Sequence, residues 1–204
     1  YLLNTIMITL VGTVGNVLLG SMAAYAISKI QFPGAKLCFK LIVLSLMFSA
    51  TVTAIPNYLI ISRLGWIDTY FALIVPALQS SLGIYLMKQF IDQIPDTLLE
   101  AAKIDGAGDM RIYLSIIMPS VKPAWLTVII LSIQSLWNIT GGNYIFSEQL
   151  KTLPVAMQQI VLGGIARAGA GAAVSVVMLS VPVLAFIIAQ SQVIETMTTS
   201  GMKE

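Results

Sequence analysis

The chain has 204 residues, of which 57% are hydrophobic and only 10% are charged, with a formal net charge of +2. A soluble domain carries about 25% charged residues, so this composition excludes an ordinary soluble domain and indicates a membrane protein. A mean hydropathy of +0.90 agrees. The lack of histidine and the single Cys38 exclude an internal disulfide, a cysteine-based metal site and most histidine-dependent enzymes. The small net charge, without a basic cluster, predicts no nucleic-acid partner.

Five apolar stretches are predicted to cross the bilayer, because each approaches the roughly 20 helical residues that the hydrocarbon core requires. They are residues 2–28, 41–61, 70–91, 123–137 and 172–190, the fourth being rather short. The first carries a small residue every four positions, which predicts one face suited to close helix packing: Gly12, Asn16, Gly20, Ala24 and Ser28. Pro56 predicts a kink in the second stretch.

The remainder of the C-terminal half is predicted to be irregular or polar. Residues 141–171 are predicted to form an external loop or a re-entrant piece, because their apolar middle, 153–165, is too short to cross. Residues 191–204 are predicted to form a polar tail.

Residues 94–119 are the most charged passage of the chain. Thr97 with Glu100 three positions later predicts a capping box and a helix that starts near residue 96 or 97. The run Asp-Gly-Ala-Gly at 105–108 predicts a break, with a positive φ at Gly106 that would penalise any side chain.

The second half of this passage predicts another short helix. Asp109 is placed to cap it, and Pro119 is expected to limit or kink the chain on entry to the next apolar stretch. The passage is therefore expected to form two short helices at an angle, joined by a glycine turn between two spans.

The spacing of this passage resembles the "EAA" loop of the permeases of bacterial ABC importers. The matching positions are Glu100, Ala101, Ala102, Gly106, Ile116 and Pro119. Met118 stands where the usual pattern has leucine, which is a mild change at an apolar position. The sequence around the motif is similar to that of the smaller permease subunit of the maltose type, in the carbohydrate-uptake branch. The similarity runs from Asn4-Thr5 to Gly201-Met202-Lys203.

The resemblance implies a fold and a function. The fold is an all-α, multi-pass helical bundle, the type I ABC importer transmembrane domain, with residues 1–204 as one permease domain. The function is ATP-driven uptake of a sugar through a bacterial plasma membrane, with residues 94–119 as the coupling loop that docks into a cytoplasmic ATPase. A second homologous permease and an external solute-binding protein are the other implied partners. The family also implies a further helix before Tyr1.

The chain itself is predicted not to be an enzyme and to need no cofactor. It has no phosphate-binding loop, so ATP would be hydrolysed on another chain. Glu100 has two open roles, a charged contact with the ATPase or closure of the capping box. Asp105 and Asp109 are interpreted as turn and cap residues.

Two other functions are compatible with parts of this pattern. The first is an ABC importer permease for another solute, such as glycerol phosphate or an oligopeptide. The second is a secondary carrier or channel, which the lack of an acidic residue inside any predicted span argues against. An intramembrane enzyme lacks a plausible nucleophile and base.

Positive charges predict the orientation. Eight of the eleven lysine and arginine residues fall on one side, which the positive-inside rule assigns to the cytoplasm together with residues 94–119 and the C-terminus. These are Lys29, Lys36, Lys40, Lys88, Lys103, Arg111, Lys122 and Lys203, against Arg63, Lys151 and Arg167 on the other side.

A sugar needs hydrogen-bonding groups and aromatic faces along its path. Candidates in the predicted spans are Asn57, Gln79, Ser80, Tyr85, Gln134, Trp137 and Asn138. For each, hydrogen bonding between helices is the alternative, or an interfacial position for Trp137. At the end of this span the related family often has Trp-Asn followed by Glu, whereas Ile139 follows Trp137-Asn138 here. In the maltose-type systems, moreover, the partner permease makes most of the contacts with the sugar.

Overall fold

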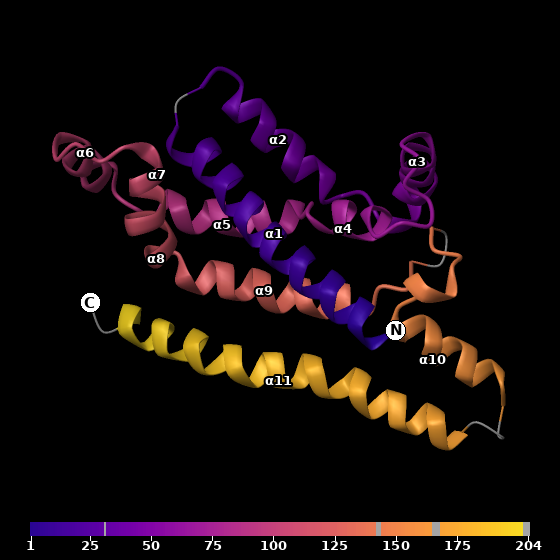
Figure 1. The fold of residues 1–204 in the computed structure, drawn as a ribbon. Coiled ribbons are helices and arrows are strands. Elements are labelled where there is room, and N and C mark those ends of the chain that lie inside the picture. The colour runs from indigo at the N-terminus through magenta and orange to yellow at the C-terminus, as the bar shows by residue number, and fades with distance from the viewer. Residues whose placement is uncertain (31, 142–143, 165–167, 202–204) are drawn as a thin grey trace.

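The computed structural model describes residues 1–30, 32–141, 144–164 and 168–201, and every regular element within them is a helix. The predicted all-helical fold is therefore confirmed. Helices α1, α5, α9 and α11 run roughly alongside one another, with the 94–119 passage at one end of the bundle and α10 near the N-terminus at the other (Figure 1). Arg167 and Lys203, two of the charges used to predict orientation, lie outside the described residues.

Helix α1 (Leu2–Lys29) is the centre of the bundle and packs against α5 (Ser81–Asp92) and α9 (Lys122–Trp137). The small residues of α1 allow this contact. A Cβ on Gly12 would lie 2.6 Å from Leu136 Cδ1 and 3.2 Å from Ala77 Cβ, so a larger residue would push the helices apart. The predicted packing face of the first stretch is confirmed.

The second predicted span is wrong as a single helix. Helix α2 (Ala35–Ser45) ends before α3 (Ala50–Arg63) begins, and α3 points in a different direction (Figure 1). The chain leaves α2 through tight turns in which Met47 and Phe48 donate to carbonyls only three residues earlier. Serine at both sides of the break favours helix ends over helix interiors, and Pro56 lies inside α3, after the break.

The third predicted span is interrupted near its middle. Helix α4 (Phe71–Ala77) ends at Leu78, and α5 begins at Ser81. Ser80 caps α5, because its hydroxyl accepts a hydrogen bond from the Gly83 amide at 3.0 Å. Pro76 lies one residue before the end of α4, where its missing N–H weakens the last turn.

The number of helices that could cross a membrane can be compared with the five predicted spans. Three described helical segments are long and apolar enough to cross a membrane: Leu2–Lys29, Phe71–Asp92 (α4 and α5 taken together) and Ala168–Ile187. The pair Asp109–Ser120 and Lys122–Trp137, bent by 80°, would be a fourth if it forms one span. The count of five spans stays a prediction.

The C-terminal region follows its prediction in part. Helix α10 (Leu153–Leu162) has 10 residues and is too short to cross, as expected. Helix α11 (Ala168–Gly201) has 34 residues and continues through most of the predicted polar tail. It packs against α9 and α10.

Asp68 organises the loop between α3 and α4, at the N-terminal end of the bundle. It has a φ of 59°, its Oδ1 accepts hydrogen bonds from the amides of Phe146 (3.0 Å) and Ser147 (2.8 Å), and its Oδ2 accepts from the Ser147 hydroxyl. The Ser147 hydroxyl, helped by the two amides, lowers the pKa of this carboxyl below its usual value. Asp68 thereby joins this loop to the chain just before the short helix η2 (Glu148–Leu150).

Candidate functional site

The first helix of the 94–119 passage is α6 (Asp96–Ile104), which begins where predicted but without the predicted capping box. Pro95 is the N-cap residue, with extended backbone, and makes no side-chain cap. The helix therefore starts two residues too early for Thr97 to cap it, because Thr97 already lies inside the first turn. Asp96 in that turn complements the helix dipole instead.

The turn after α6 is a Schellman motif, and Gly106 is its left-handed residue. The amide of Ala107 donates to the Ala102 carbonyl (2.9 Å), and that of Gly106 donates to the Lys103 carbonyl (3.0 Å). Gly106 has a φ of +79°, so the predicted positive φ is confirmed. A Cβ added to Gly106 would meet no atom within 4 Å, so its constraint within this chain is backbone conformation rather than space.

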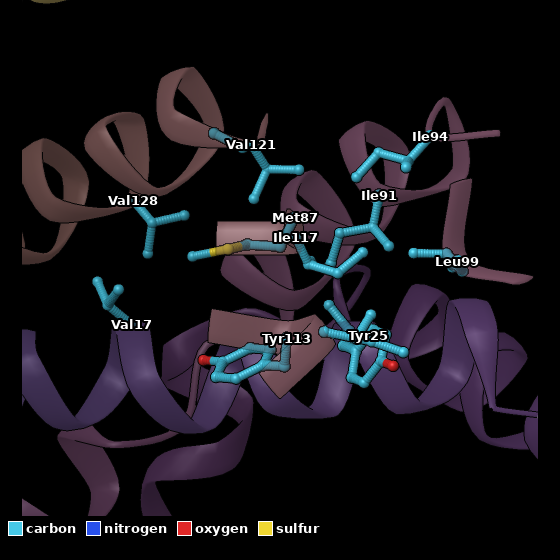
Figure 2. Close-up of a cluster of buried hydrophobic side chains, with 13 residues drawn as sticks. Val17, Tyr25, Met87, Ile91, Ile94, Leu99, Tyr113, Ile117, Val121 and Val128 are labelled. Carbon is cyan, nitrogen blue, oxygen red and sulfur yellow. The ribbon is translucent and has the colours of Figure 1, made fainter. Parts of the chain in front are cut away.

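One face of α6 is held by the body of the protein. Leu99 is buried in a cluster of apolar side chains from α1, α5, α9 and the 94–119 passage (Figure 2). Ala102 and Ala107 pack against the same cluster from either side of the turn. A contact of this kind across a Schellman motif fixes the angle at which the chain leaves the helix.

Within the part of the chain that the structure describes, the opposite face of α6 is exposed. Thr97, Glu100, Ala101 and Ile104 share it by the helical spacing i, i+3, i+4 and i+7, and all four are exposed. Ile104 is 87% exposed, which is unusual for isoleucine. We call these four residues the outer face of α6. Among the described residues, the Glu100 carboxylate accepts no hydrogen bond, so it does not close a capping box, and its contact with an ATPase stays a prediction.

Lys29, at the end of α1, joins that helix to the start of α6. Its side chain is only 8% exposed, and Nζ donates to the Ile94 carbonyl (2.6 Å) and to Asp96 Oδ1 (2.7 Å). Asp96 is 75% exposed, so the ion pair contributes little and the carbonyl contact carries more of the stabilisation. A movement of the α6 N-terminus would therefore pull on α1.

The second half of the passage winds through α7 (Asp109–Ile112), a π-helical turn η1 (Tyr113–Ile117) and α8 (Met118–Ser120). Gly108 is the N-cap of α7, so Asp109 lies in its first turn and does not cap it, contrary to the prediction. The bend of 80° into α9 falls just after Pro119, as predicted.

The π turn is fastened to α1 and α9. Tyr113 and Ser21 share a buried hydrogen bond of 2.6 Å between their hydroxyls, and the Tyr113 ring lies 5.8 Å from that of Tyr25. Trp125 Nε1 donates to the Met118 carbonyl (3.0 Å), which pairs a backbone acceptor at the bend. Figure 2 shows Tyr113 and Ile117 pointing into the cluster that also receives Leu99. Helix α6 and the π turn therefore share one core with α1.

Two neighbouring cavities lie away from this passage. The inner cavity, about 470 Å³, is lined by α1, by the break between α4 and α5, and by α9. The outer cavity, about 300 Å³, is lined by α3, α4 and the start of the loop after α9. Pro76 and Ile139 line both, so the two cavities adjoin.

Three of the predicted pathway residues line these cavities. Gln79 and Ser80 line the inner cavity, and Asn57 lines the outer cavity beside Tyr144. Asn16, Ser132 and Ser135 also line the inner cavity, although they were not predicted as pathway residues. The pattern of small residues on the first stretch places Asn16 on a packed face, but which polar residues of another helix meet it cannot be inferred from that pattern.

The other four candidates lie elsewhere. Tyr85 stacks on Phe39 of α2 with ring centres 6.1 Å apart. Trp137 is 1% exposed and its Nε1 donates to the Met178 carbonyl of α11 (3.1 Å), which is the alternative role of hydrogen bonding between helices. Asn138 donates to the Gln134 carbonyl of its own helix, and Gln134 is exposed.

Comparison with known proteins finds a matching family model. Residues 16–195 match the model described as "Binding-protein-dependent transport system inner membrane component". This range includes the whole 94–119 passage and both cavities.

Individual relatives and a solved structure agree with that match. The chain is 32% identical over 79% of its length to a polygalacturonan/rhamnogalacturonan transport system permease protein of Bacillus subtilis, covering 56% of it. It is 36% identical over 67% of its length to an sn-glycerol-3-phosphate transport system permease protein of Yersinia pestis, covering 49% of it. The chain thus spans about half the length of these relatives. A bacterial ABC transporter involved in the import of the acidic polysaccharide alginate superposes with a TM-score of 0.73 and 26% identity, over 98% of this chain and 72% of that one.

Proposed function

Because the chain belongs to the family of inner membrane components of binding-protein-dependent transport systems, we propose that it is the permease subunit of an ATP-driven sugar importer. Residues 1–204 act as one transmembrane domain in a bacterial plasma membrane. ATP is hydrolysed on separate cytoplasmic ATPase chains. A second homologous permease completes the pathway, and an external binding protein delivers the solute.

The outer face of α6 is the observation that carries the coupling role. It presents Glu100, Ala101 and Ile104, all exposed, while the opposite face is fixed to the core through Leu99. An isoleucine that is 87% exposed on a short, rigidly held helix suits a hydrophobic cleft on a partner. The small side chain of Ala101 beside it lets that partner approach closely, while Ala102 packs against the core.

The connection from this face to the spans supports the same role. Ile116 packs on the shared core and Pro119 precedes the bend into α9, while Lys29 holds the start of α6 to the end of α1. Displacement of α6 by a closing ATPase would reach α1 and α9 through rigid contacts rather than through a flexible loop. Alternating access follows if the partner permease is moved in the same way.

Orientation rests on the distribution of lysine and arginine, with α6 and the C-terminus in the cytoplasm. The solute is a sugar, which the permease relatives and the alginate importer support through the substrates in their names. Glycerol phosphate is the second candidate because of the relative named for it. A carrier that needs no ATPase remains the rival from another class.

The test is co-purification from solubilised membranes of the wild type beside Glu100→Ala and Gly106→Trp. We expect the wild type to recover an ATPase and a second permease, and Gly106→Trp to lose the ATPase but keep the second permease. Gly65→Trp is the matched control, since Gly65 also has a positive φ (68°) and open space but lies in the Asp68 loop, far along the chain from α6. Folded wild-type protein that recovers neither partner would favour the carrier.

A further inference from the structure

The inner cavity combines polar groups from three helices with an uncharged lining. The lining groups that this argument uses are Asn16, Ser80, Gly83, Ser132 and Ser135. Its volume of about 470 Å³ lies within the range of small-molecule sites. We infer that the inner cavity is a binding site for an uncharged, hydroxyl-rich part of the transported solute, an inference that rests on the proposed transport function.

Asn16 supplies an acceptor that the chain leaves unpaired. The residue is 5% exposed, and its Nδ2 donates to the Ala77 carbonyl at 3.2 Å. Its Oδ1 is buried and has no partner in the part of the chain that the structure describes. That oxygen lies 3.3 Å from the position a Cβ on Gly83 would take, so it points to the first turn of α5. A buried acceptor without a partner is costly, and a hydroxyl donor from a solute would relieve that cost.

The break between α4 and α5 supplies irregular backbone in the middle of an apolar stretch. Non-helical backbone at membrane depth is tolerated only where protein buries it or where it lines a polar cavity. Here Ser80 lines the cavity and caps α5, because its hydroxyl accepts from the Gly83 amide and its carbonyl from the Ile84 amide. The two earlier amides, those of Ser81 and Leu82, have no acceptor within their own helix. The break therefore adds both donors and acceptors beside Asn16.

Helix α9 completes the cavity with Ser132 and Ser135, which lie three residues apart. Serine hydroxyls inside the helices of this chain commonly donate to a carbonyl of the preceding turn, as Ser21 and Ser180 do (both 3.0 Å). Within the described residues, neither Ser132 nor Ser135 makes such a bond. A hydroxyl can donate and accept, so these two side chains suit a partner that does the same.

The lining excludes a charged occupant. None of the residues that line the inner cavity is acidic or basic. An anion placed there would lose its hydration without an opposite charge, which is strongly unfavourable. The relatives are named for glycerol phosphate and polygalacturonan, and the similar importer for an acidic polysaccharide. The solutes in those names are anionic, whereas the uncharged lining of the inner cavity predicts a neutral carbohydrate for this chain.

The outer cavity provides the approach. It adjoins the inner cavity at Pro76 and Ile139, and it offers the aromatic ring of Tyr144 and the amide of Asn57. Aromatic faces and amides are common partners of sugars in apolar pockets. The two adjoining cavities therefore offer one route toward the inner lining that includes Asn16.

The test uses the assembled transporter in proteoliposomes, with its partner permease, ATPases and binding protein. Radiolabelled lactose, cellobiose and maltose are the neutral probes, and digalacturonate and glycerol 3-phosphate are the anionic probes. We expect ATP-dependent uptake of a neutral probe. For that probe, Ser132→Ala with Ser135→Ala raises the KM on the order of tenfold, while the maximal rate of ATP hydrolysis is unchanged. Ser135→Ala alone should raise the KM by a smaller factor. Because Ser135 is exposed, this variant tests the cavity without disturbing a buried position.

Ser180→Ala is the matched control, because that hydroxyl bonds within its own helix and lines neither cavity. It should leave the KM unchanged. Unchanged KM in both cavity variants, or uptake of anionic probes alone, would overturn the inference and leave the transport function in place. No ATP-dependent uptake of any probe by the assembled complex would overturn the proposed function itself.

Discussion

Gly106 is the residue whose replacement tests the coupling role most directly. Its φ of +79° is a left-handed conformation, which costs an ordinary residue about 1–2 kcal/mol. No atom of this chain lies within 4 Å of an added Cβ, so Gly106→Ala adds backbone strain alone. If the turn relieves that strain by opening, the outer face of α6 shifts. The affinity for the ATPase then falls by a factor of about 5–30.

Asparagine separates backbone strain from steric exclusion. It tolerates a left-handed conformation far better than alanine, although its side chain is larger. We therefore expect Gly106→Asn to bind the ATPase better than Gly106→Ala if the turn conformation is what matters. Gly106→Trp should abolish binding because its side chain occupies the space in front of the turn.

The assay is ATPase binding to the purified permease, measured as a dissociation constant, beside ATP-dependent uptake in proteoliposomes. Membrane insertion is checked for each variant, with Gly65→Trp as the control. Wild-type affinity and uptake in Gly106→Trp would refute the coupling role of this turn. Equal loss with asparagine and alanine would instead refute the strain argument and indicate that the ATPase packs directly on Gly106.

Three contacts and the orientation give further predictions. Lys29→Met should lower the free energy of unfolding by about 1–3 kcal/mol, because it leaves a backbone carbonyl without its donor; a Lys29→Arg variant that is equally unstable would contradict this. Tyr113→Phe should lower the free energy of unfolding by about 1 kcal/mol, and a double-mutant cycle with Ser21→Ala should show that the two residues are coupled. Losses of stability that simply add would contradict the buried hydrogen bond. Asp68→Asn should loosen the loop at Ser147 and speed its amide exchange near neutral pH. Because the pKa of Asp68 is lowered in the folded protein, its ionised carboxylate stabilises the wild-type loop at neutral pH. This stabilisation is lost only as the pH falls below about 3.8, so loosening of the wild-type loop already near pH 6 would contradict the role of the carboxylate. A reporter fused to the C-terminus should report the cytoplasm, and an external signal would overturn the topology.

Local chemistry explains where prediction succeeded. A helix-favouring stretch followed by Asp-Gly-Ala-Gly favours a helix end with glycine in the left-handed conformation, so the end of α6 and the positive φ of Gly106 were predictable. Two local predictions were wrong, the capping box at Thr97 and the cap at Asp109, where Gly108 is the N-cap instead. Pro95, with its restricted φ, took the N-cap position and started the helix before Thr97.

Longer-range features were predicted less well because they depend on what each segment meets. The break between α2 and α3 carries no proline or glycine, and it follows a contact in which the Ser45 hydroxyl donates to Ser81 Oγ at 2.6 Å, a partner 36 positions away. Trp137 was a candidate for the pathway, yet α11 covers it. The pairing of helices decides both outcomes.

The amino-acid sequence by itself determined that this is a helical membrane protein with two short helices joined by a glycine turn at 94–119. Composition indicates the membrane, and helix signals and glycine positions act over only a few residues. Only the tertiary structure decided that Lys29 ties α1 to α6, that the outer face of α6 is free, and that Asn16 meets Ser80 and two serines of α9 around a cavity. The physical reason is that helix packing brings together side chains that lie far apart along the chain, from 64 positions (Asn16 and Ser80) to 119 (Asn16 and Ser135). The identity of those neighbours, not the local pattern, sets burial and unpaired polar groups.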